Sequence, residues 1–314
     1  MRVSLILWPI LLAAAPAPAQ PIAPVPDRLA ASGQTSDVHF ANDDNGRMTV
    51  PVMVAGRGPY RFLVDTGAER TVVSLELADH LNLVAGKRAT MHSVLGQSDV
   101  ATVDIPALEV SNRSTSVAGA PTLLSDNIGA DGILGVDMLK AQRVELDFKR
   151  KIMGISPSAA REALDGEEIV VVARRKHGRL LFTDATVDGR GVVVVIDTGS
   201  EVSIGNEALR AKLSRGRGVP LTAEIVTVAG EKAQAEIVLA RSLQIGGVTL
   251  KNIGIAFMPA SVFRQLDLDK RPALLLGMNA MRAFDRVSID FANSKVRFVL
   301  PGTSMASATQ LAMQ

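Results

Sequence analysis

The sequence predicts a mainly β protein made of two similar halves, with a few short helices. Short runs rich in Val and Ile alternate with Gly-, Asn- and Asp-containing turns along the chain. The tripeptide Asp-Thr-Gly occurs at 65–67 and again at 197–199, each time directly after an apolar run. Each is followed by an apolar pair and a glycine, Ile-Leu-Gly ending at Gly135 and Leu-Leu-Gly ending at Gly277. This repeated order indicates an internal duplication.

The expected strands and helices follow these runs in chain order. In the first half, strands are expected at 48–56, 60–65, 101–110 and 144–155. In the second half, they are expected at 167–175, 179–189, 192–197, 235–240, 248–258 and 287–300. Apolar residues at helical spacing predict short helices at 74–83, 136–142, 206–213 and 277–284.

The composition is that of a folded protein and excludes several kinds of partner. The 314 residues leave room for two modest domains, and 47% hydrophobic with 21% charged residues disfavours disorder as the main state. A net charge of +2 and 4% aromatic residues give no support for binding nucleic acid. The chain has no cysteine, so it can form neither a disulfide scaffold nor a lipid-attachment site.

The first 19 residues have the layout of a secretory signal peptide. Arg2 precedes an apolar run at 3–15, and the small residues Ala17 and Ala19 predict cleavage near residue 19. The run is too short for an ordinary membrane-spanning helix. We therefore expect a soluble mature protein that is periplasmic or secreted; an N-terminal anchor that stays attached is the alternative.

The remaining chain divides into five expected segments. They are a tether at 20–45, an N-terminal lobe at 46–156, an inter-lobe linker at 157–178, a C-terminal lobe at 179–300 and a tail at 301–314. A basic cluster around the linker is expected to be a solvated face: Arg174, Arg175, Lys176 and Arg179. The four histidines lack the spacing of metal ligands, so no metal and no other cofactor is expected.

A single Asp-Thr-Gly could be an ordinary turn, because all three residues favour turns. Two copies, each after an apolar strand and each followed by an apolar-apolar-Gly element, need another explanation. A carboxylate at the end of a buried strand also needs a partner. The second Asp can serve as that partner for the first.

VDTGA (64–68) with DGILG (131–135), and IDTGS (196–200) with ALLLG (273–277), resemble the pepsin and retropepsin class of aspartic proteases. The closest likeness is to the bacterial, exported retropepsin-like type with two fused lobes, and it extends over about 46–300. It implies that Asp65 and Asp197 form the catalytic pair of an endopeptidase that hydrolyses an extended protein or peptide, with water activated between the two carboxyls and without a cofactor. The residues implied to support the pair are Thr66, Gly67, Thr198, Gly199 and Ser200.

The two motifs differ in the residue after the glycine, which is Ala68 in one and Ser200 in the other. A hydroxyl at this place can donate to its own aspartate and favour the ionised form. We therefore hypothesise that the shared proton resides more on Asp65 and that Asp197 is closer to the general base.

Two hairpins, at 91–100 and 226–235, are candidates for flaps that cover a substrate. Ordinary exposed hairpins are the alternative. Neither hairpin contains the tyrosine of a pepsin flap, so the chain resembles a retropepsin dimer fused into one polypeptide, and a monomer is expected to be active. The candidate substrate-binding residues at the tips are Val94, Leu95, Gly96, Val228, Ala229 and Gly230.

Two other functions stay open at this point. An actin-like nucleotide-binding fold is also a duplication with two Asp-x-Gly loops, although the scarcity of long helices disfavours it. A catalytically inactive, protease-like binding or scaffold protein would carry the same motifs without turnover.

Overall fold

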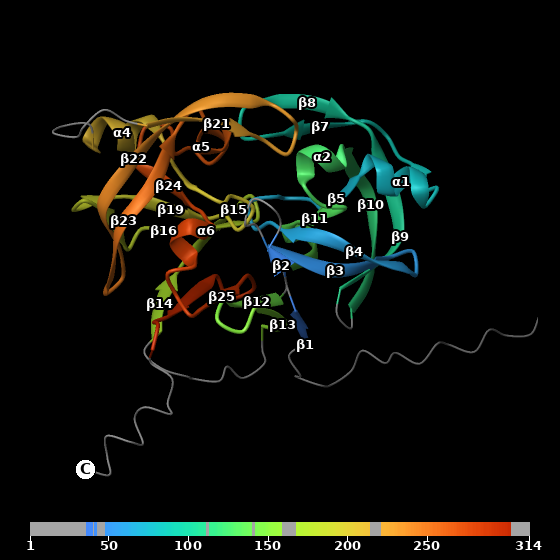
Figure 1. The fold of residues 1–314 in the computed structure, drawn as a ribbon, viewed down its shortest axis with the longest axis horizontal. Coiled ribbons are helices and arrows are strands. Elements are labelled where there is room, and N and C mark those ends of the chain that lie inside the picture. The colour runs from blue at the N-terminus through green and yellow to red at the C-terminus, as the bar shows by residue number, and fades with distance from the viewer. Residues whose placement is uncertain are drawn as a thin grey trace, which may run out of the picture. The chain divides into compact units, whose positions relative to one another are not determined.

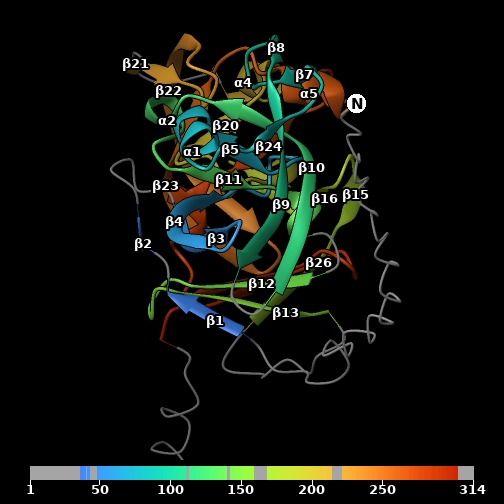
Figure 2. The same ribbon diagram turned by 90° about the vertical axis from the view of Figure 1, so that its right-hand side faces the viewer.

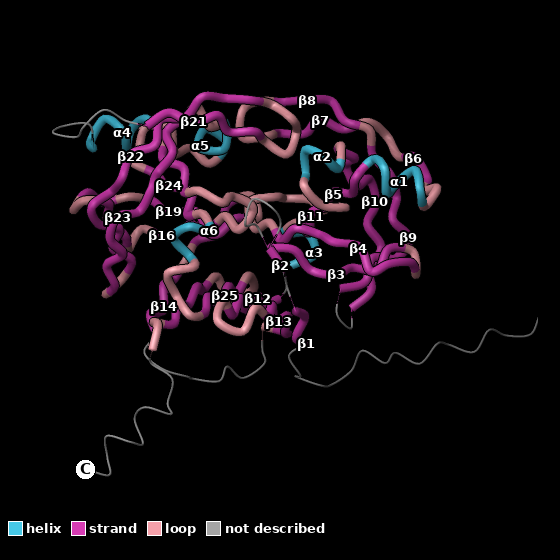
Figure 3. Tube along the Cα trace, viewed as in Figure 1, coloured by secondary structure: helices cyan, strands magenta, loops and turns pink. Residues whose placement is uncertain are grey.

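Strands dominate the computed structural model, as the sequence predicts (Figure 1, Figure 3). It describes residues 36–39, 41–42, 48–110, 113–139, 142–158, 168–213 and 221–302. The expected signal peptide, most of the tether, residues 159–167 of the linker and most of the tail lie outside these residues. None of the helices formed by the described residues is long and apolar enough to cross a membrane.

The first lobe is built on an eight-stranded sheet in the order β2-β3-β4-β11-β5-β10-β9-β6. Figure 2 shows its long β9–β10 hairpin running along one side of the molecule. The bounds are β2 Ala41–Asn42, β3 Met48–Val54, β4 Arg57–Val64, β5 Val72–Ser74, β6 Val84–Ala85, β9 Thr102–Val110, β10 Arg113–Leu123 and β11 Gly132–Leu134. A separate hairpin consists of β7 Ala89–His92 and β8 Gln97–Val100.

The second lobe is built on a ten-stranded sheet in the order β15-β16-β19-β24-β20-β23-β22-β17-β18, with β21 paired to β22. The bounds are β15 Arg174–Lys176, β16 Arg179–Phe182, β17 Ala185–Val187, β18 Arg190–Gly191, β19 Val193–Ile196, β20 Ser203–Gly205, β21 Leu221–Val226, β22 Lys232–Ile245, β23 Val248–Phe257 and β24 Ala273–Leu276.

A six-stranded sheet below both lobes joins them, because it takes strands from each half in the order β1-β13-β12-β25-β26-β14 (Figure 1). β12 and β25 pair across the halves, with Val144 opposite Ile289. The bounds are β1 Ser36–His39, β12 Gln142–Asp147, β13 Ile152–Pro157, β14 Glu168–Val172, β25 Arg286–Asp290 and β26 Lys295–Val299.

β14 and β15 lie within the segment expected as a linker at 157–178, where a strand is also expected at 167–175. β14 pairs with β26 in the joining sheet, and Val171 is 2% exposed. The apolar alternation of this segment therefore determines its structure more than the polar residues around it do. The lobe boundaries at 46–156 and 179–300 stay predictions.

The described residues form six short helices, and the four predicted helices are among them with shorter bounds. Ser74 caps α1, since its hydroxyl accepts a hydrogen bond from the Leu77 N–H at 3.1 Å. The bounds are α1 Leu75–His80, α2 Ser125–Ile128, α3 Val136–Leu139, α4 Glu207–Leu213, α5 Ser261–Gln265 and α6 Met278–Met281.

The two lobes repeat one arrangement of strands. β4 runs parallel to β11, which runs antiparallel to β5; β19, β24 and β20 are related in the same way. The register agrees residue by residue: Val72 lies opposite Ile133 in the first lobe, and Ile204 lies opposite Leu275 in the second. The fold is thus a duplicated, two-lobed, pepsin-like fold.

Candidate active site

The two Asp-Thr-Gly loops leave equivalent strands and meet between the lobes. Asp65 follows β4 and Asp197 follows β19. The Asp65 N–H donates to the Leu134 carbonyl at 3.0 Å, and the Asp197 N–H donates to the Leu276 carbonyl at 3.1 Å. The ends of β11 and β24, which carry the apolar-Gly elements, therefore hold both aspartates in the same way.

Thr66 and Thr198 connect the loops by reciprocal hydrogen bonds. Each backbone N–H donates to the other hydroxyl, at 3.0 Å and 3.1 Å. The Thr66 hydroxyl donates to the Ile196 carbonyl at 3.2 Å, and the Thr198 hydroxyl donates to the Val64 carbonyl at 2.7 Å. Both threonines are buried, so water does not compete with these bonds.

Gly67 and Gly199 lie against the carboxyl group of the opposite loop. A Cβ on Gly67 would lie 2.7 Å from Asp197 Oδ1, and one on Gly199 would lie 2.3 Å from Asp65 Cγ. Both distances are well below van der Waals contact. The glycines are needed here because the two backbones approach closely, as the resemblance implies.

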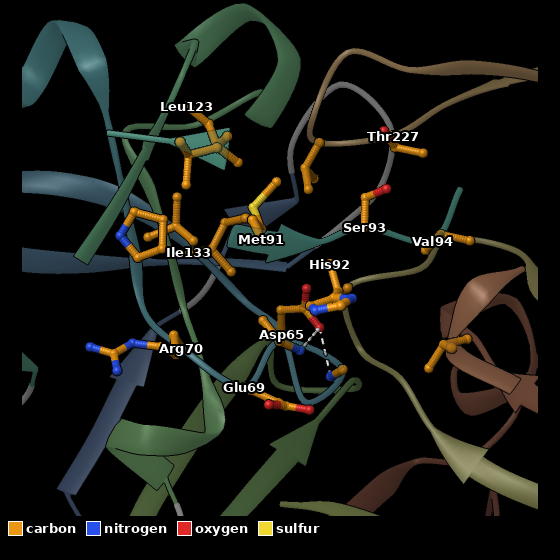
Figure 4. A pocket seen from close by; sticks show the side chains of 18 of the residues that line it. Asp65, Glu69, Arg70, Met91, His92, Ser93, Val94, Leu123, Ile133 and Thr227 are labelled. Carbon is orange, nitrogen blue, oxygen red and sulfur yellow. Dashed lines mark hydrogen bonds between the residues drawn. The ribbon is translucent and has the colours of Figure 1, made fainter. Parts of the chain in front are cut away.

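The two carboxyls lie side by side, since a Cβ on Gly67 would lie 2.7 Å from Asp197 Oδ1 and 3.1 Å from Asp65 Oδ1, and they are surrounded differently. Asp65 Oδ1 accepts hydrogen bonds from Gly67 N–H at 2.7 Å and Ala68 N–H at 3.0 Å (Figure 4). Asp197 Oδ1 accepts from Gly199 N–H at 3.1 Å. Burial raises the pKa of both groups, and the Asp65 charge helps to raise the pKa of Asp197 to about 7. Two buried carboxyls this close share one proton, and the additional N–H donor favours the ionised form of Asp65.

This geometry contradicts the hypothesis that Ser200 makes Asp197 the ionised partner. The Ser200 hydroxyl donates to the Val202 carbonyl at 2.7 Å, within its own loop. The additional donor of the site is instead a backbone N–H, that of Ala68, and it binds Asp65. A carboxylate that accepts two N–H groups is favoured in its charged form. The hydrogen bonds therefore favour Asp65, and not Asp197, as the ionised partner.

Arg179 is part of the site, and its prediction as a solvated residue is wrong. It lies at the start of β16, is 8% exposed, and reaches the Asp-Thr-Gly loop of the other lobe. Its Nε donates to the Gly67 carbonyl at 2.8 Å, and its Nη1 donates to Glu69 at 3.0 Å. The charge of Arg179 lowers the pKa of both aspartates, against the effect of burial. The sequence signal for this burial was the position of Arg179 directly before an apolar strand.

Two further pairs of polar residues, not found by sequence reasoning, tie each loop to its apolar-Gly element. The Thr71 hydroxyl donates to Asp137 at 2.8 Å, and the Ser203 hydroxyl donates to Asn279 at 2.8 Å. Thr71 and Ser203 are each the sixth residue after the aspartate, and Asp137 and Asn279 are each the second after the glycine. Aligning the two halves would have found them.

Replacing Arg179 by Met is expected to raise the pKa of both aspartates, because a positive charge that lowers both is lost. It should also destabilise the fold by about 1–3 kcal/mol, since the Gly67 carbonyl loses its donor. The measurements are a carbon-13 NMR titration of the carboxyl groups and urea unfolding. Ser200→Ala is the matched control and should move neither pKa. Equal titration of the Arg179→Met and Ser200→Ala chains would contradict the role of Arg179.

A cavity of about 1480 Å³ lies over the aspartates and is lined by residues of both lobes. Asp65 and Asp197 line it, together with Met91, His92 and Ser93 of the first hairpin and Thr227 of the second. In Figure 4, Asp65 lies below Ser93 and Thr227. Among the described residues no group of three or more His, Cys, Asp or Glu could hold a metal ion.

The two hairpins cover the cavity, and their tips pack into opposite lobes (Figure 1). Val94 and Leu95, from the first lobe, pack against an apolar cluster of the second lobe. Val228, from the second lobe, packs against a cluster of the first. Val94 and Val228 line the cavity, whereas four other predicted flap residues do not: Leu95, Gly96, Ala229 and Gly230. Those four lie at the tips, where the chain turns; Gly230, for example, packs on Asn127.

Hydrogen bonds join the tip of the first hairpin to the second hairpin and to α5. The Ser93 hydroxyl donates to the Glu231 carboxylate of the other hairpin. Ser261, at the start of α5, donates its N–H to the Val94 carbonyl at 2.6 Å and its hydroxyl to the Ser93 carbonyl at 2.5 Å. The first hairpin is therefore bonded to the second lobe at three atoms.

Glu231→Ala is expected to loosen both tips. A hydrogen bond to a charged group contributes about 1.5–3 kcal/mol, so local amide exchange of 94–96 should accelerate roughly 10-fold or more. Hydrogen–deuterium exchange measures this. Glu224→Ala, which removes the ion pair with Lys232 inside the second hairpin and leaves the bond between the tips, is the control. Unchanged exchange at both tips would show that the bond does not hold them closed.

Comparison with protein families agrees with the geometry. The family model described as "gag-polyprotein putative aspartyl protease" matches residues 50–141, and the one described as "Aspartyl protease" matches residues 183–280. Each match contains one Asp-Thr-Gly loop and its apolar-Gly element. No curated protein matches the chain. The mainly β fold also excludes the actin-like alternative. Two aspartyl protease domains on one duplicated fold show that the chain belongs to the retropepsin-like aspartic proteases with two lobes.

Proposed function

We propose that this chain is an endopeptidase that hydrolyses peptide bonds by activating water between Asp65 and Asp197. One observation carries the proposal: the carboxyls of Asp65 and Asp197, from the two halves of the chain, lie side by side in a cavity that both hairpins line. Two such groups share one proton, which provides a base and an acid side by side.

The proposed reaction assigns one role to each aspartate. Ionised Asp65 accepts a proton from the water, whose oxygen attacks the peptide carbonyl carbon, while Asp197 gives its proton to the carbonyl oxygen. A tetrahedral diol results. As the carbon–nitrogen bond breaks, Asp65 passes its proton to the leaving nitrogen and Asp197 takes a proton back from the diol. The pair thereby returns to its starting state.

The substrate is proposed to be a protein or peptide segment in an extended conformation. The hairpins would bind such a segment strand to strand and exclude water from the reacting bond. Both aspartates belong to one chain, which supports an active monomer. No cofactor enters the proposed reaction.

Digestion of an unfolded protein from pH 4 to 8, with and without a statine peptide, tests the proposal. We expect cleavage that the statine peptide blocks and that declines as pH rises through about 7, where Asp197 loses its proton. An intact chain that binds the protein without cutting it would favour the inactive binding or scaffold protein. Cleavage that the statine peptide does not block would contradict the proposed site.

We also propose that the chain is exported and works in the periplasm or outside the cell. The support is the layout of residues 1–19, with one basic residue, an apolar run and small residues before the expected cleavage site. N-terminal sequencing of the protein recovered from fractionated cells tests this. A chain that keeps its first 19 residues and sediments with membranes would indicate the anchor instead.

A further inference from the structure

The internal repeat makes the two walls of the cavity comparable position by position. Val72 and Ile133 are paired in the first lobe as Ile204 and Leu275 are in the second, and all four line the cavity. Equivalent residues of the two lobes therefore face opposite sides of the scissile bond of an extended substrate. Where these two residues differ, the cavity is expected to prefer different side chains on the two sides of that bond.

The largest such difference beside the catalytic loops is at the fifth residue after each aspartate. This residue is Arg70 in the first lobe and Val202 in the second, and both line the cavity. Val202 packs against the apolar cluster of the second lobe. Arg70 is exposed, and within the described part of the chain no carboxylate forms an ion pair with it.

The guanidinium of Arg70 is held in place by the backbone. Its Nη2 donates to the Ala118 carbonyl at 2.5 Å and is 3.4 Å from the Gly119 carbonyl. Besides Asp65, the first-lobe wall has two more cations, Lys87 and Arg88, and three acids, Glu69, Asp104 and Asp126, of which Glu69 is paired with Arg179. Because one end of this guanidinium is already fixed, the side chain loses little conformational entropy when its other N–H groups bind a carboxylate.

The cation of the second-lobe wall, Arg179, is buried and already bonded to the Gly67 carbonyl and to Glu69. The acids Glu201 and Glu224 of this wall are already paired, Glu201 with Arg282 at 2.6 Å and Glu224 with Lys232 at 3.0 Å. The other residues of this wall are mostly apolar and include Ile204, Ile225, Met258 and Val262. An unpaired charged side chain placed there would lose its water without gaining a partner.

We propose that Arg70 makes the cleft selective for an acidic side chain on one side of the scissile bond, with an apolar side chain preferred at the mirrored position. The inference rests on the proposed function and names its substrate class. The recognising interaction is a charge-assisted, two-point hydrogen bond between the guanidinium and a carboxylate of Asp or Glu.

Peptide sets that differ only in Glu against Gln at each position around the cleaved bond test this. In the parent chain, kcat/KM should be about 10-fold or more higher for the Glu peptide than for the Gln peptide at one position. The reason is that Gln cannot form the ion pair with Arg70 in this partly desolvated site. Arg70→Val should bring that ratio near 1. Val202→Arg should create a new preference at the mirrored position. Arg190→Val, which removes an exposed cation outside the cavity, is the control.

Binding of the same peptides to the Asp197→Asn chain separates this inference from the proposed function. Tighter binding of Glu than of Gln peptides, abolished by Arg70→Val, supports the acidic subsite even if the parent chain cleaves nothing. Cleavage or binding with equal preference for Glu and Gln overturns the inference and leaves the endopeptidase proposal intact. A preference that persists in Arg70→Val also overturns it.

Discussion

Asp65→Asn and Asp197→Asn are each expected to lower kcat/KM for peptide cleavage by about 10²- to 10⁴-fold. Asn at 65 cannot take a proton from water, and Asn at 197 can donate a hydrogen bond but cannot give up a proton. Neither change adds volume, so the contacts of Thr66 and Thr198 should survive. A fluorogenic peptide assay measures the loss, and near-ultraviolet circular dichroism checks the fold. Either variant cutting as fast as the parent would end the proposal of a shared proton.

The Asp197→Asn chain also tests the protonation state through stability. The pKa of Asp197 is raised from 3.8 to about 7 in the folded chain, so its contribution to stability is fully present below about pH 4 and is lost as pH rises through 7. The parent should therefore lose stability relative to Asp197→Asn between pH 4.5 and 8, on the order of a few kcal/mol. Urea unfolding of both chains at the two pH values measures this. A difference that is independent of pH would mean that Asp197 is already ionised.

Gly199→Ala is expected to abolish measurable activity, with an effect comparable to the loss of an aspartate. The new methyl group would lie 2.3 Å from Asp65 Cγ and 2.4 Å from Asp65 Oδ2, where no atom can be accommodated. The carboxyl must move, and a small displacement of a catalytic group costs about 10²-fold or more in rate. Overpacking should also destabilise the fold by about 1–3 kcal/mol.

Gly191→Ala is the matched control for this change. Gly191 lies in β18 of the same lobe, and a Cβ there would meet no atom within 4 Å. Its activity and melting temperature should remain those of the parent. If Gly199→Ala is as active as Gly191→Ala, the two loops do not pack as closely as this geometry requires.

Much of the architecture and the central pair could be predicted because their signals are local and occur twice. An apolar strand ending in Asp-Thr-Gly, and an apolar pair ending in glycine, are each readable within a few residues. The duplication then implies that Asp65 and Asp197 occupy equivalent positions. The β7–β8 and β21–β22 hairpins were predicted in the same way, from turn residues between short strands. By contrast, β10 was missed, because its glycine, proline and serines disfavour a strand and its pairing with β9 overrides them.

The sequence by itself therefore determined the mainly β class, the internal duplication and which two aspartates stand at equivalent places. Only the tertiary structure decided which aspartate accepts more backbone N–H groups, that Arg179 supports the loop of the other lobe, and that each hairpin tip packs into the opposite lobe. These features depend on contacts between residues far apart in the chain, 112 positions for Arg179 and Gly67 and 138 for Ser93 and Glu231. Local patterns do not encode such contacts, because they form only when the two lobes pack together and bury the groups between them.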